Sequence, residues 1–170
     1  MRKILQYHPH KCMGCHSCEL ACSFKHEREF NPQFARIFVE IDGSYHIPLT
    51  CSQCENPWCA SICAKNAIRR NLETGAIEVD QKLCVGCHMC TLACPFGLIV
   101  MGPREKAIKC NLCGGDPECV KACTYGALEF TMEETRILER RNIIFQFLKK
   151  SFFGLEPSPK NLTLPEVKHE

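Results

Sequence analysis

Four cysteines fall within eleven residues near the start of the chain, in the segment CMGCHSCELAC at residues 12–22. Two residues separate Cys12 from Cys15 and Cys15 from Cys18, whereas three separate Cys18 from Cys22. A disulfide between such close cysteines gains little, because the loop that it closes is very short. A structural zinc site takes its ligands from separate pairs, so a third closely spaced thiol has no place. The spacing indicates an iron–sulfur site instead.

The same kind of run occurs four times in the 170-residue chain and accounts for all 16 cysteines. Every run ends in a C-x3-C interval. The runs are Cys12, Cys15, Cys18, Cys22; Cys51, Cys54, Cys59, Cys63; Cys84, Cys87, Cys90, Cys94; and Cys110, Cys113, Cys119, Cys123. The first and third also match between their thiols, as CMGCHSC and CVGCHMC. This internal similarity indicates duplication of a two-cluster unit.

Composition and charge favour bound metal over other uses of the cysteines. No charged-then-apolar leader precedes the first run, so we expect a cytoplasmic location, where thiols stay reduced. No stretch approaches the roughly 18 apolar residues that a membrane span needs. The formal charge is +2, and four oxidised clusters of about −2 each would take it to about −6. That total argues against a nucleic-acid-binding protein.

Gly14 and Gly86 hold equivalent positions inside the first and third runs. Glycine adopts positive φ freely and lets the backbone approach closely, so that amides can donate to cluster sulfurs. The three-residue interval at the end of a run begins a helical turn, which directs the last thiol away from the other three. We therefore expect Cys22 to bind a different cluster from Cys12, Cys15 and Cys18.

In order, the four spacings are x2-x2-x3, x2-x4-x3, x2-x2-x3 followed by Pro95, and x2-x5-x3. They resemble those of the iron–sulfur electron-transfer subunits of molybdenum and tungsten oxidoreductases. The same family includes polyferredoxin partners of hydrogenases and carbon monoxide dehydrogenases. The resemblance covers about residues 4–131. It implies an α+β fold, a duplicated bacterial ferredoxin-like unit with two [4Fe–4S] clusters, rich in loops, with short β-hairpins and short helices.

In that family the first run pairs with the fourth, and the second with the third, which implies four ligand sets. They are site A (Cys12, Cys15, Cys18, Cys123), site B (Cys110, Cys113, Cys119, Cys22), site C (Cys51, Cys54, Cys59, Cys94) and site D (Cys84, Cys87, Cys90, Cys63). The implied outer unit spans 1–48 and 105–131, and the inner unit spans 49–104. The sequence leaves open whether one site holds a [3Fe–4S] cluster or none.

Two departures from the family pattern are Ala64 and Thr124, which stand where a proline often follows the last cysteine. Neither is a ligand, so they affect only loop geometry. A narrower resemblance lies in CELACSFKHEREFNP followed by ARIFVEI. This segment is similar to the small subunits that accompany tungsten enzymes of the aldehyde oxidoreductase type, which include tungsten-dependent benzoyl-CoA reductase. It implies a tungsten enzyme of anaerobic metabolism as the partner.

Alternation predicts strands at 35–41 and 76–80, the second after a turn at Glu73, Thr74 and Gly75. Helical spacing predicts a helix over 132–153, with a capping box at Thr131 and Glu134. It would cover its own domain, dock on a catalytic subunit or, least favoured, lie on a membrane surface. Three prolines predict an extended tail over 154–170, either disordered or laid along a partner.

Histidines and the single tryptophan are weaker candidates. His16 and His88 lie inside cluster loops and either tune the clusters or simply face solvent. His8, His10, His26 and His46 have no ligand spacing. Trp58 is either an anchor for a partner or a residue that shields a cluster.

No nucleophile–base pair, phosphate loop or dinucleotide motif is found in the sequence. We therefore predict a subunit that conducts electrons through four [4Fe–4S] clusters and has no catalytic residues of its own. It would link a larger tungsten or molybdenum enzyme to an external carrier such as ferredoxin. The alternatives are a partner of a hydrogenase or carbon monoxide dehydrogenase, a free polyferredoxin, and a zinc-binding interaction module. A brown anaerobic preparation would distinguish iron–sulfur clusters from colourless zinc.

Overall fold

The computed structural model describes residues 3–43 and 45–132. The chain divides into two units, Met1–Thr131 and Met132–Glu170, and the description below concerns the first. The helix and tail predicted over 132–153 and 154–170 lie outside the described residues, apart from Met132. The capping box at Thr131 and Glu134 also lies partly outside them.

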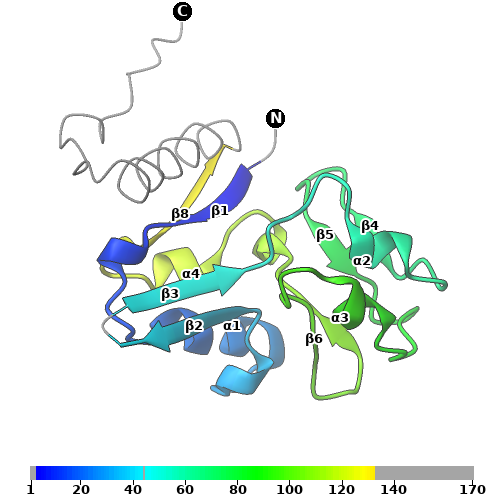
Figure 1. Cartoon of the computed structure of the whole chain (residues 1–170), viewed down its shortest axis with the longest axis horizontal. Helices are drawn as coiled ribbons and strands as arrows, with labels where there is room; N and C mark the ends of the chain where they lie inside the picture. The colour runs from blue at the N-terminus through cyan, green and yellow to red at the C-terminus, as the bar shows by residue number, and fades with distance from the viewer. Residues whose placement is uncertain (1–2, 44, 133–170) are drawn as a thin grey trace, which may run out of the picture. The chain divides into compact units, whose positions relative to one another are not determined.

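Strands and helices are short, and long connections carry most of the cysteines (Figure 1). The strands are β1 (Lys3–Tyr7), β2 (Ile37–Asp42), β3 (Tyr45–Thr50), β4 (Ile68–Arg70), β5 (Ile77–Val79), β6 (Val100–Met101), β7 (Ala107–Ile108) and β8 (Leu128–Met132). The α-helices are α1 (Ser17–Glu27), α2 (Trp58–Ser61), α3 (Met89–Ala93) and α4 (Glu118–Lys121). Single 3₁₀ turns occupy Pro9–Lys11, Pro32–Phe34 and Leu112–Gly114. The predicted mixture of small sheets and short helices is confirmed.

Among the described residues, the strands form four two-stranded sheets: β1–β8, β2–β3, β4–β5 and β6–β7. The last three are antiparallel, with Ile37 opposite Thr50 and Ile68 opposite Val79. The strands predicted at 35–41 and 76–80 are β2 and β5, so both predictions are confirmed with small shifts of their ends. The turn before β5 forms because the Asn71 side chain accepts hydrogen bonds from the next residues, including Glu73 N at 2.9 Å.

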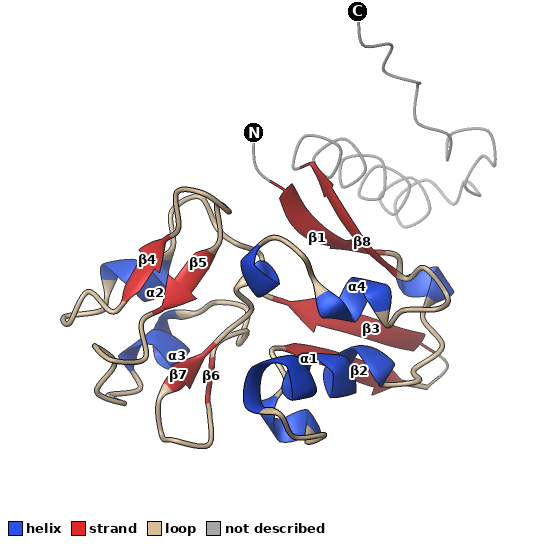
Figure 2. Cartoon of the chain, turned by 180° about the vertical axis from the view of Figure 1, so that it is seen from behind, coloured by secondary structure: helices blue, strands red, loops and turns tan. Residues whose placement is uncertain are grey.

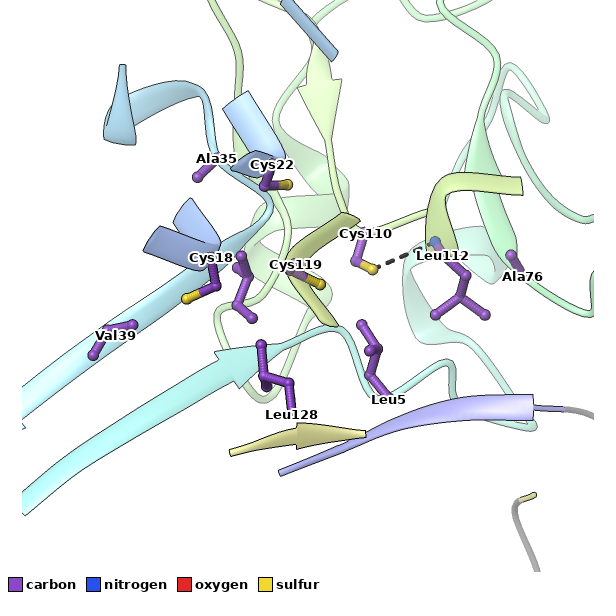
Figure 3. Close-up of a cluster of buried hydrophobic side chains, with 11 residues drawn as sticks. Leu5, Cys18, Cys22, Ala35, Val39, Ala76, Cys110, Leu112, Cys119 and Leu128 are labelled. Atoms are coloured by element: carbon purple, nitrogen blue, oxygen red, sulfur yellow. Dashed lines mark hydrogen bonds between the residues drawn. The ribbon is translucent and has the colours of Figure 1, made fainter. Parts of the chain in front are cut away.

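Two groups of buried side chains lie within the first unit. The outer core, drawn in Figure 3, combines residues from both flanks of the chain: Leu5, Cys18, Cys22, Ala35, Ile37, Val39, Ala76, Cys110, Leu112, Cys119 and Leu128. The inner core comes from the middle: Cys59, Ile68, Ile77, Cys90, Ile99 and Ala107. Figure 2 shows the matching grouping of elements, with α2, α3 and β4 to β7 together and α1, α4, β1, β2, β3 and β8 together. Cysteines therefore take core positions that apolar side chains fill in most proteins.

Candidate metal centres

The four thiols of site A line one cavity. Cys12 and Cys15 come from the loop before α1, Cys18 from the first turn of α1, and Cys123 from the segment after α4. Burial, together with the charges of Glu19, Cys12 and Cys15, raises the pKa of the Cys18 thiol to about 12. Residues 111 positions apart in the chain thus meet around a single space.

Two further cavities hold the thiols of sites C and D. Cys51, Cys54, Cys59 and Cys94 line one of them, together with Trp58 and Phe96. Cys63, Cys84, Cys87 and Cys90 line the other, together with Val85 and Met89. In each case three thiols come from one run and the fourth from the partner run. The thiols that line each cavity are those that the family resemblance groups together, and their role as cluster ligands stays a prediction.

The thiols of site B lie in the outer core, where Figure 3 draws Cys22, Cys110 and Cys119. Burial raises the pKa of Cys119, and the charges of Cys110, Cys22 and Cys113 add to this effect. Burial, together with the charges of Cys110 and Cys113, likewise raises the pKa of Cys22 to about 12. Such mutual effects require that the four sulfurs lie near one another.

Neighbouring sites lie next to one another in the order A, B, C, D. Helices α1 and α4 pack together and bring Cys18 of site A and Cys119 of site B into one core. Cys51 of site C packs against that core beside Cys110. Helices α2 and α3 pack together in the same way and place Cys59 of site C with Cys90 of site D. Thiols of consecutive sites therefore lie near one another within the two cores.

Backbone amides donate to the last cysteine of every run. The donors are Arg36 N to Cys22 (3.2 Å), Ala67 N to Cys63 (3.3 Å), Leu98 N to Cys94 (3.4 Å) and Ala127 N to Cys123 (3.2 Å). Gln53 N and Leu112 N donate in the same way to Cys51 and Cys110, each at 3.4 Å. In three runs the donor lies four residues after the cysteine, at the end of the turn that follows it. These N–H···S bonds favour the electron-rich state of a bound cluster.

Gly14 and Gly86 have φ of 66° and 71°, as the sequence predicts. A Cβ on Gly86 would lie 2.3 Å from the carbonyl oxygen of Glu105, and one on Gly14 would lie 2.5 Å from the His46 ring. His16 and His88 follow with φ of 57° and 63° and precede α1 and α3. The two cluster loops therefore share one backbone path, and a glycine is required in both.

The histidines of these loops differ in their partners. His16 Nδ1 lies 2.8 Å from Glu19 Oε2, and the other oxygen of this buried carboxylate accepts from Val39 N. His88 is exposed. Trp58 lines the cavity of site C, and 69% of its surface is exposed.

His26, for which the sequence predicts no role, lies beside site B, with Nε2 3.8 Å from Cys113 Sγ. Burial, followed by the charges of Arg36 and Lys25, lowers its pKa to about 4. In the tautomer with its proton on Nε2, the ring donates a hydrogen bond to the sulfur. Its place four residues after Cys22 puts both on one face of α1, and this spacing is the signal in the sequence.

The donor set fits iron–sulfur clusters better than single ions. All 16 cysteines are free, and no group of three or more His, Cys, Asp and Glu side chains in the described ranges is arranged around one metal ion. A tetrahedral zinc site needs four such ligands within bonding distance of one ion. The thiols of sites A, C and D instead line cavities, four to each. Backbone amides donate to cysteine sulfurs at all four sites, which is one of the ways a protein tunes a bound cluster.

Comparison with known proteins identifies the family. Residues 43–133 match the 4Fe-4S dicluster domain, which is more than half of the chain. The chain belongs to this family. It is 41% identical over 118 residues to the polyferredoxin-like subunit of an aliphatic sulfonate oxidoreductase of Pyrococcus furiosus, a match that covers 68% of each chain. It is 35% identical over 164 residues to an uncharacterised ferredoxin of Methanocaldococcus jannaschii, covering 95% of this chain and 92% of that one.

Among solved structures, the dicluster protein is similar to a chain of the active site complex BamBC of benzoyl coenzyme A reductase in complex with zinc. The identity is 27% and the TM-score is 0.45, over 88% of this chain and 91% of that chain. The prediction of a ferredoxin-like iron–sulfur electron-transfer subunit is confirmed by the family and its members. In the described part of the chain, none of the helices has the length and apolar character needed to cross a bilayer.

Proposed function

We propose that the chain binds four [4Fe–4S] clusters at sites A to D and passes single electrons along them. The observation that carries the proposal is that thiols of neighbouring sites share a buried core, Cys18 with Cys119 and Cys59 with Cys90. When bound, each cluster supplies a one-electron couple that changes charge without breaking bonds. The order of contacts gives electrons a path from site A to site D.

The residues of the chain contribute position, shielding and charge. The thiol loops of sites A and D have backbone that cannot move freely, because Gly14 and Gly86 lie against neighbouring groups. Buried Cys18, Cys22 and Cys119 exclude water from the junction between sites A and B. Amide and imidazole donors stabilise negative charge on the sulfurs. Fixed geometry of this kind keeps the reorganisation on electron transfer small.

We also propose that the chain is a duplicated ferredoxin-like unit, with an outer unit at 1–48 and 105–131 and an inner unit at 49–104. Two observations support it. The outer core draws its residues from both flanks except for Ala76, and the inner core draws its residues from 49–104 except for Ala107. The loops around Gly14 and Gly86 also repeat the same sequence and the same backbone path.

For a partner, we propose a larger catalytic subunit of an oxidoreductase, of the tungsten or molybdenum type, with ferredoxin or a similar carrier at the other end. The Pyrococcus relative is named as a subunit of an oxidoreductase, and the segment from Cys18 to Pro32 resembles tungsten-enzyme subunits. Sixteen free thiols fit the reducing cytoplasm. The chain contributes no catalytic residue of its own under this proposal.

An anaerobic reductive titration tests the proposed function. The purified chain should take up about four electrons, one per cluster, with bleaching of its broad visible absorption. Uptake of no electrons by a colourless, zinc-containing chain would contradict it. A tagged copy isolated from the native host under anaerobic conditions should retain a larger redox subunit. Recovery of the 19.3 kDa chain alone would favour a free polyferredoxin, and retention of a hydrogenase subunit would replace the tungsten enzyme as partner.

A further inference from the structure

Lys109 is a lysine whose side chain is buried at the junction of the two cores, with only 3% of its surface exposed. Its Nζ donates to the carbonyl oxygen of Cys110 at 3.1 Å and to that of Ile77. Cys110 belongs to the outer core and Ile77 to the inner core. The ammonium group therefore lies where the two halves of the first unit meet.

The surroundings of Lys109 belong to sites B and C. Lys109 lines the cavity of site C together with Cys51 and Cys59, and its own neighbour in the chain is Cys110 of site B. Burial raises the pKa of the Cys59 thiol, while the positive charge of Lys109 acts in the opposite direction. The charge of Lys109 also lowers the pKa of the Cys110 thiol, but less than the hydrogen bonds to that thiol do, and burial raises this pKa most strongly. Its charge thus reaches sulfurs of both sites.

Gln53 completes this polar junction and is 1% exposed. Its Nε2 donates to the Cys110 carbonyl at 2.9 Å, and its Oε1 accepts from Ile77 N at 2.8 Å. The same two residues that bind Lys109 are therefore fixed by a second buried side chain. Movement of the Lys109 side chain to solvent would break both of its own hydrogen bonds, to the carbonyl oxygens of Ile77 and Cys110.

A buried ammonium requires a compensating negative charge. Among the ion pairs of the described residues, none joins Lys109 to a carboxylate. Carbonyl oxygens satisfy its hydrogen bonds but carry no net charge. The remaining source of negative charge at this position is the pair of thiolate sites on either side.

We propose that Lys109 is the charge-compensating residue of sites B and C, and that it raises the reduction potential of both clusters relative to a chain with a neutral residue there. The inference rests on the proposed function. One-electron reduction of either site adds one negative charge beside Nζ and breaks no bond, and the electron comes from the external carrier at one end of the chain. With an effective dielectric constant of about 20, a unit charge about 8 Å away changes the equilibrium constant for this reduction more than tenfold. Lys109 thereby stabilises an added electron on sites B and C relative to sites A and D.

The test compares reduction potentials of the four clusters in the wild-type chain and in Lys109→Gln, Lys109→Met and Lys109→Arg. Potentials are read by EPR-monitored titration and assigned to sites by the signal lost in Cys15→Ser, Cys113→Ser, Cys54→Ser and Cys87→Ser. The neutral variants should lower the equilibrium constant for one-electron reduction of sites B and C about tenfold, which lowers their reduction potentials by about 59 mV. Sites A and D should change by less than about threefold. Lys109→Arg should stay near wild type.

Lys3→Gln is the matched control, because it removes the same charge from an exposed lysine at the start of β1 and should leave all four potentials unchanged. Unchanged potentials of sites B and C in a neutral variant with a full complement of iron would overturn the inference. If neither neutral variant assembles clusters, assembly in Lys109→Arg supports the need for charge, and failure of Lys109→Arg contradicts it. Absence of clusters from the wild-type chain would instead refute the proposed function.

Discussion

Cys22 is the residue in which the crossed arrangement is tested most simply. It follows Cys18 by one helical turn on α1, yet its sulfur lies with Cys110, Cys113 and Cys119. Cys18 in turn lies with Cys12, Cys15 and Cys123 around the cavity of site A. Two cysteines of one helix therefore face different sites.

We predict that Cys22→Ser removes or perturbs the cluster of site B and leaves that of site A largely intact. Serine keeps the size of the side chain but replaces the thiolate, which is the ligand that iron–sulfur clusters require. EPR of the reduced variant, with each signal assigned beforehand, measures the outcome. Cys18→Ser is the matched control on the same helix and should give the opposite loss. Loss of site A in Cys22→Ser would refute the crossed ligand sets.

His26 acts on the same site through a hydrogen bond. We predict that His26→Leu lowers the reduction potential of site B alone, because the N–H···S bond to Cys113 is lost and the reduced state has more charge on sulfur. His26→Gln, which keeps an N–H donor, should restore part of the difference. His10→Leu, which alters an exposed histidine, is the control. A change at site D, or none at site B, would count against this role.

The loops before α1 and α3 have a restricted backbone conformation. Both pass through a glycine and a histidine with positive φ before the helix begins. The first turn of each helix then supplies Cys18 or Cys90 to the core. The helices are short because they only need to place these thiols.

We predict that Gly86→Ala shortens the lifetime of the site D cluster far more than Gly97→Ala does. Both glycines have positive φ, so each alanine costs about 1–2 kcal/mol in backbone strain. Only at Gly86 would the Cβ also meet a backbone atom, the Glu105 oxygen at 2.3 Å, whereas nothing lies within 4 Å at Gly97. The decay of visible absorption at a fixed temperature measures the difference. Equal decay in the two variants would show that the close approach at Gly86 does not matter.

The cysteine loops and two of the strands could be predicted from the sequence, whereas the contacts of Lys109 and His26 could not. The runs of cysteines, the strands β2 and β5, and the positive φ of Gly14 and Gly86 all follow from local pattern. Lys109 contacts Ile77 across 32 positions, and His26 meets Cys113 across 87. No local pattern specifies such contacts, because they depend on how the loops fold together. The spacing of Cys22 and His26 indicates only that they share a face of one helix, and nothing in the local sequence indicates the partners of Lys109.

For the whole molecule, cysteines contribute a large share of the buried side chains. Four of the eleven residues of the outer core and two of the six of the inner core are cysteines. Buried apolar side chains alone supply little folding free energy in a domain with cores this small. Cluster binding must supply much of the rest.

We predict that removal of iron by an anaerobic chelator unfolds residues 3–132. Circular dichroism should lose its native signal in step with iron release, and amide hydrogen exchange should become fast throughout the two cores. Reconstitution with iron and sulfide should restore both. An apoprotein that keeps native circular dichroism and cooperative thermal unfolding would show that the cores are sufficient without clusters.

If the proposed function is right, the sixteen thiols bind four neighbouring [4Fe–4S] clusters. Iron and acid-labile sulfide analysis of the anaerobically purified chain, combined with Mössbauer spectroscopy, tests it most directly. We expect about sixteen irons and sixteen sulfides per chain, with all iron in the form typical of [4Fe–4S] clusters. Zinc in place of iron, or about eight irons with two of the four sites lacking metal, would contradict it.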